Sequence, residues 1–235
     1  MFGTRETWVS LGENCLCDDV LKRHGLKAFS TPFSPSRSNI DYAIAADASE
    51  FRGFLDRENL VYGMTGGEHV VRSTLYSCDA ELFNASVTRG FETTHHDIIA
   101  NEKHRSSYAR KIDRWNDLRR SRVPVVFLYH HRLSIRPNLR IIAAKVETFL
   151  SGFSRDGAEC RAVIVHQTVA GPEADRGVEV SSFNRRITTA HFHTHRSWSG
   201  EAASVFGRPD DDLFVELLRQ VGTRPRSWFR QRFAG

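Results

Sequence analysis

The sequence contains little cysteine, and this scarcity excludes a protein held together by disulfide bonds. Only Cys15, Cys17, Cys78 and Cys160 occur in 235 residues, whereas disulfide-stabilised domains carry cysteines at far higher density. The Cys15-x-Cys17 pair lacks zinc-finger spacing, and no second pair exists that could complete a four-thiolate zinc site. We therefore expect the four thiols to be free.

Long apolar runs are also missing. No segment approaches the roughly 20 apolar residues that a membrane-spanning helix needs, and the first ten residues hold no apolar block of the signal-peptide kind. We therefore expect a cytoplasmic protein without a membrane partner. The length and the ordinary share of hydrophobic and charged residues predict one globular domain over residues 1–235.

The net charge is +5, and arginines supply most of the positive charge. The cluster at Lys103–Arg122 alternates with apolar residues, which predicts an amphipathic helix with a charged outer face. No aromatic-rich recognition module accompanies it, so we expect no nucleic-acid partner. The second cluster, Arg219–Arg232, is either a docking tail or a last turn packed on the core, and the sequence leaves both open.

Hydrophobic periodicity predicts alternating strands and helices. This order is typical of an α/β (or α+β) domain with a mixed, mostly parallel sheet flanked by helices. Predicted strands are Trp8–Leu11, Val70–Tyr76, Val123–Tyr129, Arg161–His166 and Arg185–His195. Predicted helices are Leu16–His24, Ile40–Asp47, Phe51–Leu60, Asn101–Arg120, Leu139–Phe149 and Leu213–Val221.

Cys15 follows Gly12 at the point where the first predicted strand turns into the first predicted helix. The free N–H groups and the dipole at a helix N-terminus lower the pKa of a thiol and stabilise a developing oxyanion. Cys15 is therefore a candidate nucleophile. The alternative is a small buried cysteine that merely packs at the junction.

A nucleophilic thiol needs a base, and the base needs an orienting group. The best candidates for the base are His95 and His96 in Thr94-His95-His96-Asp97, between an apolar segment and a helix. Asp97 directly follows His96, so its carboxylate cannot easily reach that ring. Orienting groups from other elements are Asp113, Asn116 and Asn184. The alternative is a pair of solvated loop histidines.

Several short segments together resemble one family. They are Ser10-Leu11-Gly12-x-x-Cys15, Leu21-Lys22-x-x-Gly25-Leu26, Pro32-Phe33, Phe91-x-x-x-His95-His96-Asp97, the basic helix from Tyr108 to Trp115, and Val125-Val126-Phe127. Over roughly residues 8–132 the chain is similar to the DUF1796 family, described as "putative papain-like cysteine peptidases". The resemblance implies Cys15 as nucleophile and His96 or His95 as base. The family usually continues Pro-Phe with Asp-Trp, whereas this chain has Ser34-Pro35, which removes that acidic residue from any orienting role here.

These observations give a mechanistic hypothesis. His96 would take the proton of Cys15, and the thiolate would attack the carbonyl of an ester or amide in a small-molecule or peptide substrate. The backbone N–H of Cys15, helped by Asn14, would stabilise the oxyanion. Water would complete a hydrolysis, and an amine or hydroxyl acceptor would complete an acyl transfer. No cofactor is expected.

A metal site is the first alternative. His191, His193 and His195 alternate on a predicted strand and so share one face. With His130 or His166 from a neighbouring strand, they could bind zinc in a metal-dependent hydrolase. The competing interpretation is a half-exposed strand with polar residues facing water. The sequence has neither the His-Glu-x-x-His pattern of metalloproteases nor the Gly-x-Ser-x-Gly elbow of serine hydrolases.

The second alternative is a non-catalytic or transferase module of surface-polysaccharide metabolism. In that case the arginine-rich face would bind an anionic sugar-containing substrate, and Cys15 would be unreactive. Arg132 ends a predicted central strand, where ligands bind in parallel sheets, so it is a candidate for recognising an anion.

Overall fold

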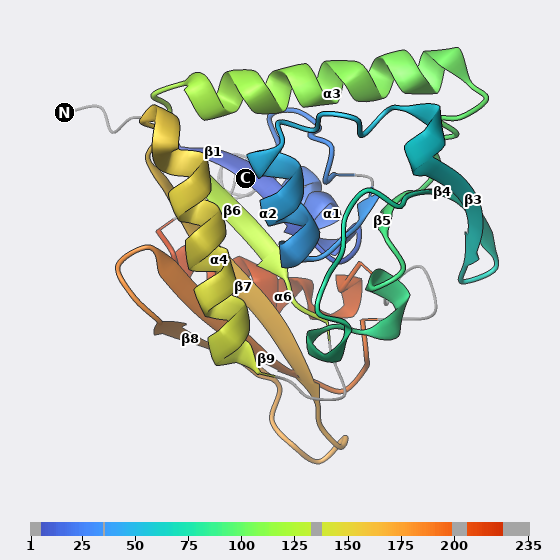
Figure 1. The fold of residues 1–235 in the computed structure, drawn as a ribbon. Helices are drawn as coiled ribbons and strands as arrows, with labels where there is room; N and C mark the ends of the chain where they lie inside the picture. Colours follow the sequence, from blue (N-terminus) through green and yellow to red (C-terminus); the bar gives the residue numbers. More distant parts are fainter. Residues whose placement is uncertain (1–5, 35, 133–137, 199–205, 223–235) are drawn as a thin grey trace, which may run out of the picture.

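A five-stranded sheet with the order β1-β6-β7-β9-β8 forms the centre of the molecule (Figure 1). Its strands are β1 (Thr7–Gly12), β6 (Val125–His130), β7 (Cys160–Val169), β9 (Ile187–Thr194) and β8 (Gly177–Ser182). Neighbours from β1 to β9 are parallel, and only β8 is antiparallel. The predicted α/β class with a mostly parallel sheet is therefore confirmed in this computed structural model.

The structure describes residues 6–34, 36–132, 138–198 and 206–222. The segment Arg224–Arg232, the main part of the second basic cluster, lies outside these ranges. No helix within them is long and apolar enough to cross a membrane.

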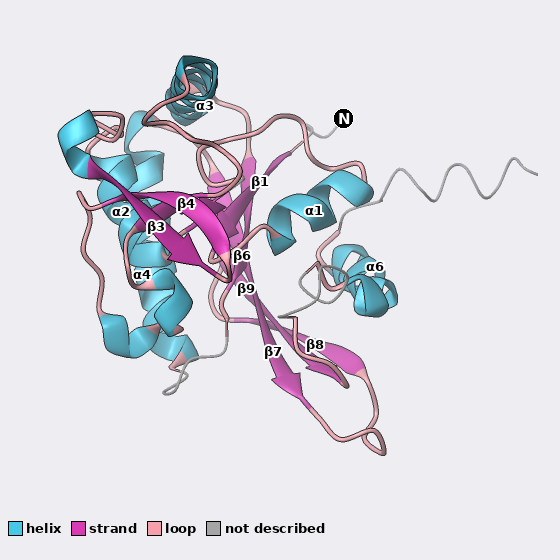
Figure 2. Ribbon diagram, turned by 90° about the vertical axis from the view of Figure 1, so that its right-hand side faces the viewer, coloured by secondary structure: helices cyan, strands magenta, loops and turns pink. Residues whose placement is uncertain are grey.

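Helices cover both faces of the sheet (Figure 2). They are α1 (Leu16–Arg23) and α6 (Asp211–Gln220) on one face, and α2 (Ile40–Ala48) and α4 (Leu139–Phe153) on the other. Each strand therefore buries side chains on both faces: Trp8 packs in the cluster of α1 and α6, and Val9 in that of α2 and α4. This burial explains why β6 reads as a continuous apolar run.

Helix α3 (Glu102–Arg120) is the predicted basic helix. Tyr108, Trp115 and Leu118 face the core, as the amphipathic pattern requires. Two basic residues depart from the expected charged outer face, because Lys111 and Arg119 are buried as well. Arg119 donates to the backbone oxygen of Asp47 at 2.9 Å. The carboxylates of Asp47 and Asp156 lie 3.7 and 3.0 Å from its guanidinium and balance its charge.

A small antiparallel sheet with the order β2-β5-β4-β3 is inserted between α1 and α3. Its strands are β2 (Ser36–Arg37), β3 (Leu60–Thr65), β4 (Glu68–Ser73) and β5 (Phe91–Thr93). The strand predicted at Val70–Tyr76 corresponds to β4. The inserted sheet matters for function because β5 leads directly into the histidine pair.

The helix predicted at Phe51–Leu60 is wrong. Only a short 3-10 turn at Arg57–Asn59 forms there, and Leu60 already begins β3. Glu50, Phe51 and Gly53 have positive φ angles of 52°, 58° and 74°. A right-handed helix cannot continue through such left-handed residues.

Candidate cysteine site

Cys15 occupies the N-cap position of α1, three residues after the carboxyl end of β1. The turn between them needs a glycine. Gly12 has a φ of 149°, and a Cβ there would lie 2.9 Å from the backbone nitrogen of His130 on β6. The predicted strand–turn–helix placement of the thiol is thus present, at the edge of the sheet where parallel α/β folds bind ligands.

The surroundings of the thiol differ from the expectation in one respect. Cys15 is half-buried, and its Sγ lies 3.9 Å from Oγ1 of Thr94, the residue after β5. Burial raises the pKa of the Cys15 thiol, and the contact with Thr94 only partly opposes this effect. Desolvation of the thiolate, the largest cause, therefore acts against the lowered pKa that we expected at the helix N-terminus.

His96 is joined to the same threonine. Its Nδ1–H donates to the backbone oxygen of Thr94 at 3.0 Å, and its Nε2 lies 3.4 Å from the ammonium of Lys111. Burial lowers the pKa of His96, and the positive charge of Lys111 adds to the effect. Thr94 therefore contacts the thiol through its hydroxyl and the imidazole through its carbonyl, and places both in one neighbourhood.

His95 is placed differently. Its side chain is exposed, and its backbone is left-handed, with a φ of 61°. This conformation turns the chain between Thr94 and His96. The two adjacent histidines therefore differ in burial, since His95 is exposed and His96 is half-buried. Of the two, His96 shares a contact residue with the thiol, because both touch Thr94.

Lys111 is a part of the site that sequence reasoning missed. It is buried on α3, and its ammonium lies over the ring of Tyr108, 4.7 Å from the centroid. Burial lowers the pKa of Lys111 to about 8, and Arg114 and Lys27 contribute further repulsion. A signal was available, because Lys111 lies three residues after Tyr108 and four before Trp115, on the apolar stripe of the helix.

Among the described residues, the carboxylate of Asp97 makes no hydrogen bond or ion pair with His95 or His96. Its Oδ1 accepts hydrogen bonds from the backbone N–H groups of Ile99 and Ala100, at 3.0 and 2.9 Å. Tyr62 also donates its hydroxyl to this carboxylate. The carboxylate thus closes the turn before α3 and ties it to the inserted sheet.

The side chain of Asn14 is used within the fold. Its Oδ1 accepts from the backbone N–H of Leu16 at 3.1 Å and from Nδ1 of His130 at 3.0 Å. His130 is buried, and burial lowers its pKa well below the ordinary range. Asn14, the residue before Cys15, therefore links the start of α1 to the end of β6.

The three orienting groups considered from the sequence lie elsewhere. Asp113 is exposed on α3, and Asn184 donates to Glu147 at 3.0 Å. Asn116 is half-buried, and its Oδ1 has no hydrogen-bond partner among the described residues. The contacts given for His96 lead instead to Thr94 and Lys111.

A buried carboxylate beside the site was also missed. Glu13 is fully buried, and its Oε1 accepts from the hydroxyl of Tyr129 and from Nδ1 of His131, both at 2.9 Å. Its Oε2 accepts from the backbone N–H of Arg132 at 3.0 Å. Arg132, the predicted anion-recognition residue, also donates to Ser86 at 2.6 Å and is half-buried. Glu13 thereby fixes the ends of β1 and β6 to each other.

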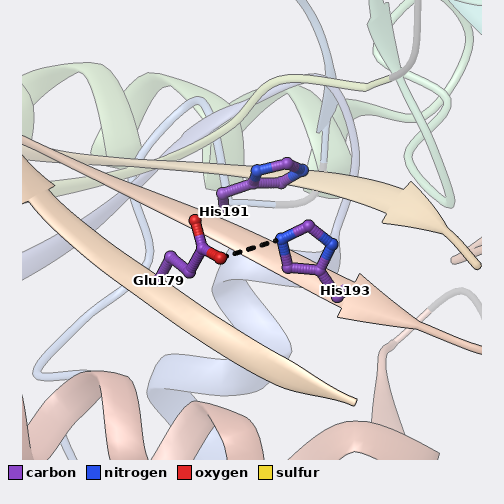
Figure 3. A group of neighbouring side chains, drawn as sticks. All are labelled: Glu179, His191 and His193. Atoms are coloured by element: carbon purple, nitrogen blue, oxygen red, sulfur yellow. Dashed lines mark ion pairs between the residues drawn. The ribbon is translucent and has the colours of Figure 1, made fainter. Parts of the chain in front are cut away.

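The predicted histidine strand is β9, and it places two of its three histidines together. His191 and His193 share a face of the sheet with Glu179 of β8 (Figure 3), and one potential ligand atom of each lies within 4.8 Å of the others. His195 lies beyond the end of β9 and contacts the backbone oxygen of Ala174 instead. The expected grouping of all three histidines is not formed, because the alternation of side chains ends with the strand.

His166 of β7 extends this face. Its ring stacks on that of His191, with centroids 4.3 Å apart. Burial, together with the neighbouring His191, lowers the pKa of His166 to about 4, and burial lowers that of His191 as well. These imidazoles are therefore neutral at neutral pH. His130, the other partner considered, faces α1 and Trp198 and is not in the group.

Comparison with known proteins gives one match. The family model "Putative papain-like cysteine peptidase (DUF1796)" matches residues 6–165, more than half of the chain. The matched region contains Cys15, His95 and His96, and it ends within β7. No curated protein and no solved structure matches this chain significantly.

Proposed function

Because the chain belongs to the DUF1796 family of putative papain-like cysteine peptidases, we propose that it is a hydrolase or acyltransferase with Cys15 as nucleophile and His96 as base. The observation that carries this proposal is the position of Cys15 at the N-cap of α1, beside the threonine that also holds His96. Substrates of this chemistry are esters or amides of small molecules or peptides.

The hydrogen bond from Nδ1 to Thr94 leaves the lone pair of His96 on Nε2. Burial and the charge of Lys111 lower the pKa of His96, which favours this neutral form, so Nε2 can accept a proton. In the free protein the Lys111 ammonium lies next to Nε2. We infer that the Lys111 side chain withdraws when a substrate binds, so that Nε2 takes the Cys15 proton.

The thiolate then attacks the carbonyl carbon of the substrate, and the carbonyl π electrons move to oxygen. The carbon–heteroatom bond breaks, and His96 returns the proton to the leaving alcohol or amine, which leaves a thioester on Cys15. Water, or an amine or hydroxyl acceptor, resolves the thioester in the second step. The acceptor gives its proton to His96, and the thiol is regenerated.

Backbone N–H groups of the first turn of α1 suit the oxyanion, because helix N-terminal amides lack partners inside the helix. The amide of Leu16 is already bound by Asn14. The N–H of Cys15 is the donor we assign to the oxyanion, and Asn14 acts by holding the turn that aims it.

Turnover of a panel of nitrophenyl esters and aminoacyl nitroanilides tests the proposal. Cys15→Ala is expected to lose about 10³-fold or more in kcat/KM, and His96→Ala about 10²-fold or more. The acyl-enzyme should be visible as an adduct on Cys15 by intact mass spectrometry of the wild-type protein. A lasting adduct in His96→Ala would assign the histidine to the second step.

Matched controls are His95→Ala and Cys78→Ala. His95 is exposed, and Cys78 is another half-buried free thiol remote in sequence from α1. Both variants are expected to retain most of the turnover. Activity that survives in Cys15→Ala, or that disappears equally in Cys78→Ala, would remove Cys15 from the proposed role.

A further inference from the structure

The pairing of β8 with β9 places Glu179, His191 and His193 next to one another. His191 and His193 are two residues apart on β9 and so point to the same face. Glu179 of β8 is the direct partner of His191 in the antiparallel register. The three side chains converge above the edge of the sheet, with the carboxylate leaning toward His193 (Figure 3).

The separation of the ligand atoms matches a tetrahedral metal site. Nε2 of His193 and Oε1 of Glu179 are 3.5 Å apart. Two ligands bound to zinc at about 2.0–2.1 Å and at the tetrahedral angle lie about 3.3 Å from each other. The pair is therefore already spaced as two coordinating atoms are, without a hydrogen bond between them.

One nitrogen of this group makes no hydrogen bond, although it lies 3.5 Å from the Glu179 carboxylate. Nε2 of His193 is shielded from solvent and makes no hydrogen bond with the described residues. A buried polar atom without a partner is costly and calls for an explanation. A metal ion bound to this nitrogen supplies one, because the ion takes up its lone pair.

Two residues around His191 can hold its ring in the orientation that a metal ligand needs. Oγ1 of Thr168 lies 2.7 Å from Nε2 of His191, and the ring of His166 stacks on the same imidazole. When Nε2–H donates to that hydroxyl, the lone pair of His191 is on Nδ1. Ligating histidines commonly use their second nitrogen in this way.

The site is also accessible and leaves room for a further ligand. The Glu179 side chain is 77% exposed, and that of His193 is 32% exposed. Gly177 is the β8 partner of His193, and no atom lies within 4 Å of where its Cβ would be. Two histidines and a glutamate with an open position form the ligand set of several catalytic zinc sites.

We propose that Glu179, His191 and His193 bind a divalent transition-metal ion of the zinc class, with solvent or a substrate oxygen in the fourth position. Nitrogen and carboxylate donors in this number favour zinc over magnesium or calcium, which prefer all-oxygen sites. The site is independent of Cys15, and its existence does not rest on the cysteine mechanism.

The test uses the full chain, freed of metal with a chelator and titrated with Zn²⁺ in a calorimeter. One ion per chain is expected to bind. His193→Ala and Glu179→Gln should each weaken that binding by about tenfold or more. Titration with Co²⁺ provides a second readout, because a tetrahedral nitrogen and oxygen site gives intense visible absorption that these variants should lose.

Two controls separate this site from other zinc ligands. His195→Ala removes an adjacent histidine that lies outside the group, and Cys15→Ala removes the thiol that soft metals prefer. Both variants should bind Zn²⁺ as the wild type does, and circular dichroism should show that all variants are folded. Binding that is absent from the wild type, unchanged in His193→Ala, or lost in Cys15→Ala would overturn the proposal.

Discussion

The ammonium of Lys111 lies 3.4 Å from Nε2 of His96 in a partly buried contact, and both groups would be cationic if both were protonated. Only one of them can carry a charge there at low cost. Burial lowers the pKa of both, that of Lys111 to about 8 and that of His96 below its ordinary value. At neutral pH the lysine is charged and the histidine is neutral, which is the state a general base requires.

A prediction on stability follows from the Lys111 charge. The unfolded chain holds the Lys111 proton up to a pH of about 10.4, whereas the folded protein releases it near pH 8. The protonated lysine thus destabilises the fold below pH 8, and this penalty fades between pH 8 and about 10.4. We expect Lys111→Met to stabilise the protein at pH 7 by about 1–2 kcal/mol, measured by urea unfolding.

The difference between Lys111→Met and wild type should shrink as the pH rises through that window. Lys103→Met is the matched control, because Lys103 is exposed on the same helix. It should change stability by less than about 0.5 kcal/mol at any pH. A Lys111→Met variant that is less stable than wild type at pH 7 would contradict the burial argument.

A second prediction concerns the reactivity of Cys15. Because burial raises its pKa, iodoacetamide should alkylate it with an apparent pKa above the ordinary value of about 8.5. His96→Ala should leave that apparent pKa nearly unchanged, since the neutral imidazole adds no charge. Alkylation of wild type and variant across pH 6 to pH 10, with the site identified by peptide mass spectrometry, measures both values.

The opposite result would be equally informative. An apparent pKa well below 8.5 that rises in His96→Ala would mean a thiolate–imidazolium pair, and would contradict the ordering of charges described for His96 and Lys111. Cys78→Ala again serves as the control, because it removes the other half-buried thiol without touching α1.

Local signals in the sequence were sufficient for most of the main sheet and its helices. The apolar run of β6 and the helix cap at Asn39, whose side chain accepts from the N–H of Tyr42, are contained in a few adjacent residues. Strands β3 and β8 were missed because they are exposed on one or both faces, with burial patterns that lack an apolar alternation. Their pairing partners, not their own composition, define them.

The candidate sites also combine features that adjacent residues predict with features that depend on distant segments. The thiol at a strand–helix turn was predictable, since Gly12 and Cys15 lie close together in the sequence. Its raised pKa was not predictable, because the burial that raises it depends on how segments distant in the sequence pack around the thiol. Likewise His191 and His193 were identifiable from alternation, whereas Glu179 joins them only through the register of β8 with β9.

A third prediction addresses Glu13. Glu13→Gln replaces the carboxylate that accepts hydrogen bonds from Tyr129, His131 and Arg132 by an amide with one acceptor oxygen. Because these donors are buried, we expect a loss of about 2–4 kcal/mol in the free energy of unfolding. Urea unfolding at pH 7 provides the measurement.

Glu6→Gln is the control for that experiment. Glu6 pairs with Arg161 at 2.8 Å, but both side chains are about one-third exposed. Partly exposed ion pairs contribute little, so a loss below about 1 kcal/mol is expected. Equal losses of unfolding free energy in the two variants would show that the burial of Glu13 does not increase its contribution to stability.

The last prediction concerns the turn that presents the thiol. Gly12→Ala would place a Cβ 2.9 Å from the backbone nitrogen and 3.1 Å from the oxygen of His130, at a φ of 149°. Backbone atoms cannot yield as a flexible side chain does, so the end of β1 must shift away from β6. We expect a loss of about 2 kcal/mol or more in stability, together with altered alkylation of Cys15. Gly171→Ala, where no atom lies within 4 Å of the added carbon, should change neither. Normal Cys15 reactivity in a fully stable Gly12→Ala protein would show that the thiol does not depend on this glycine turn.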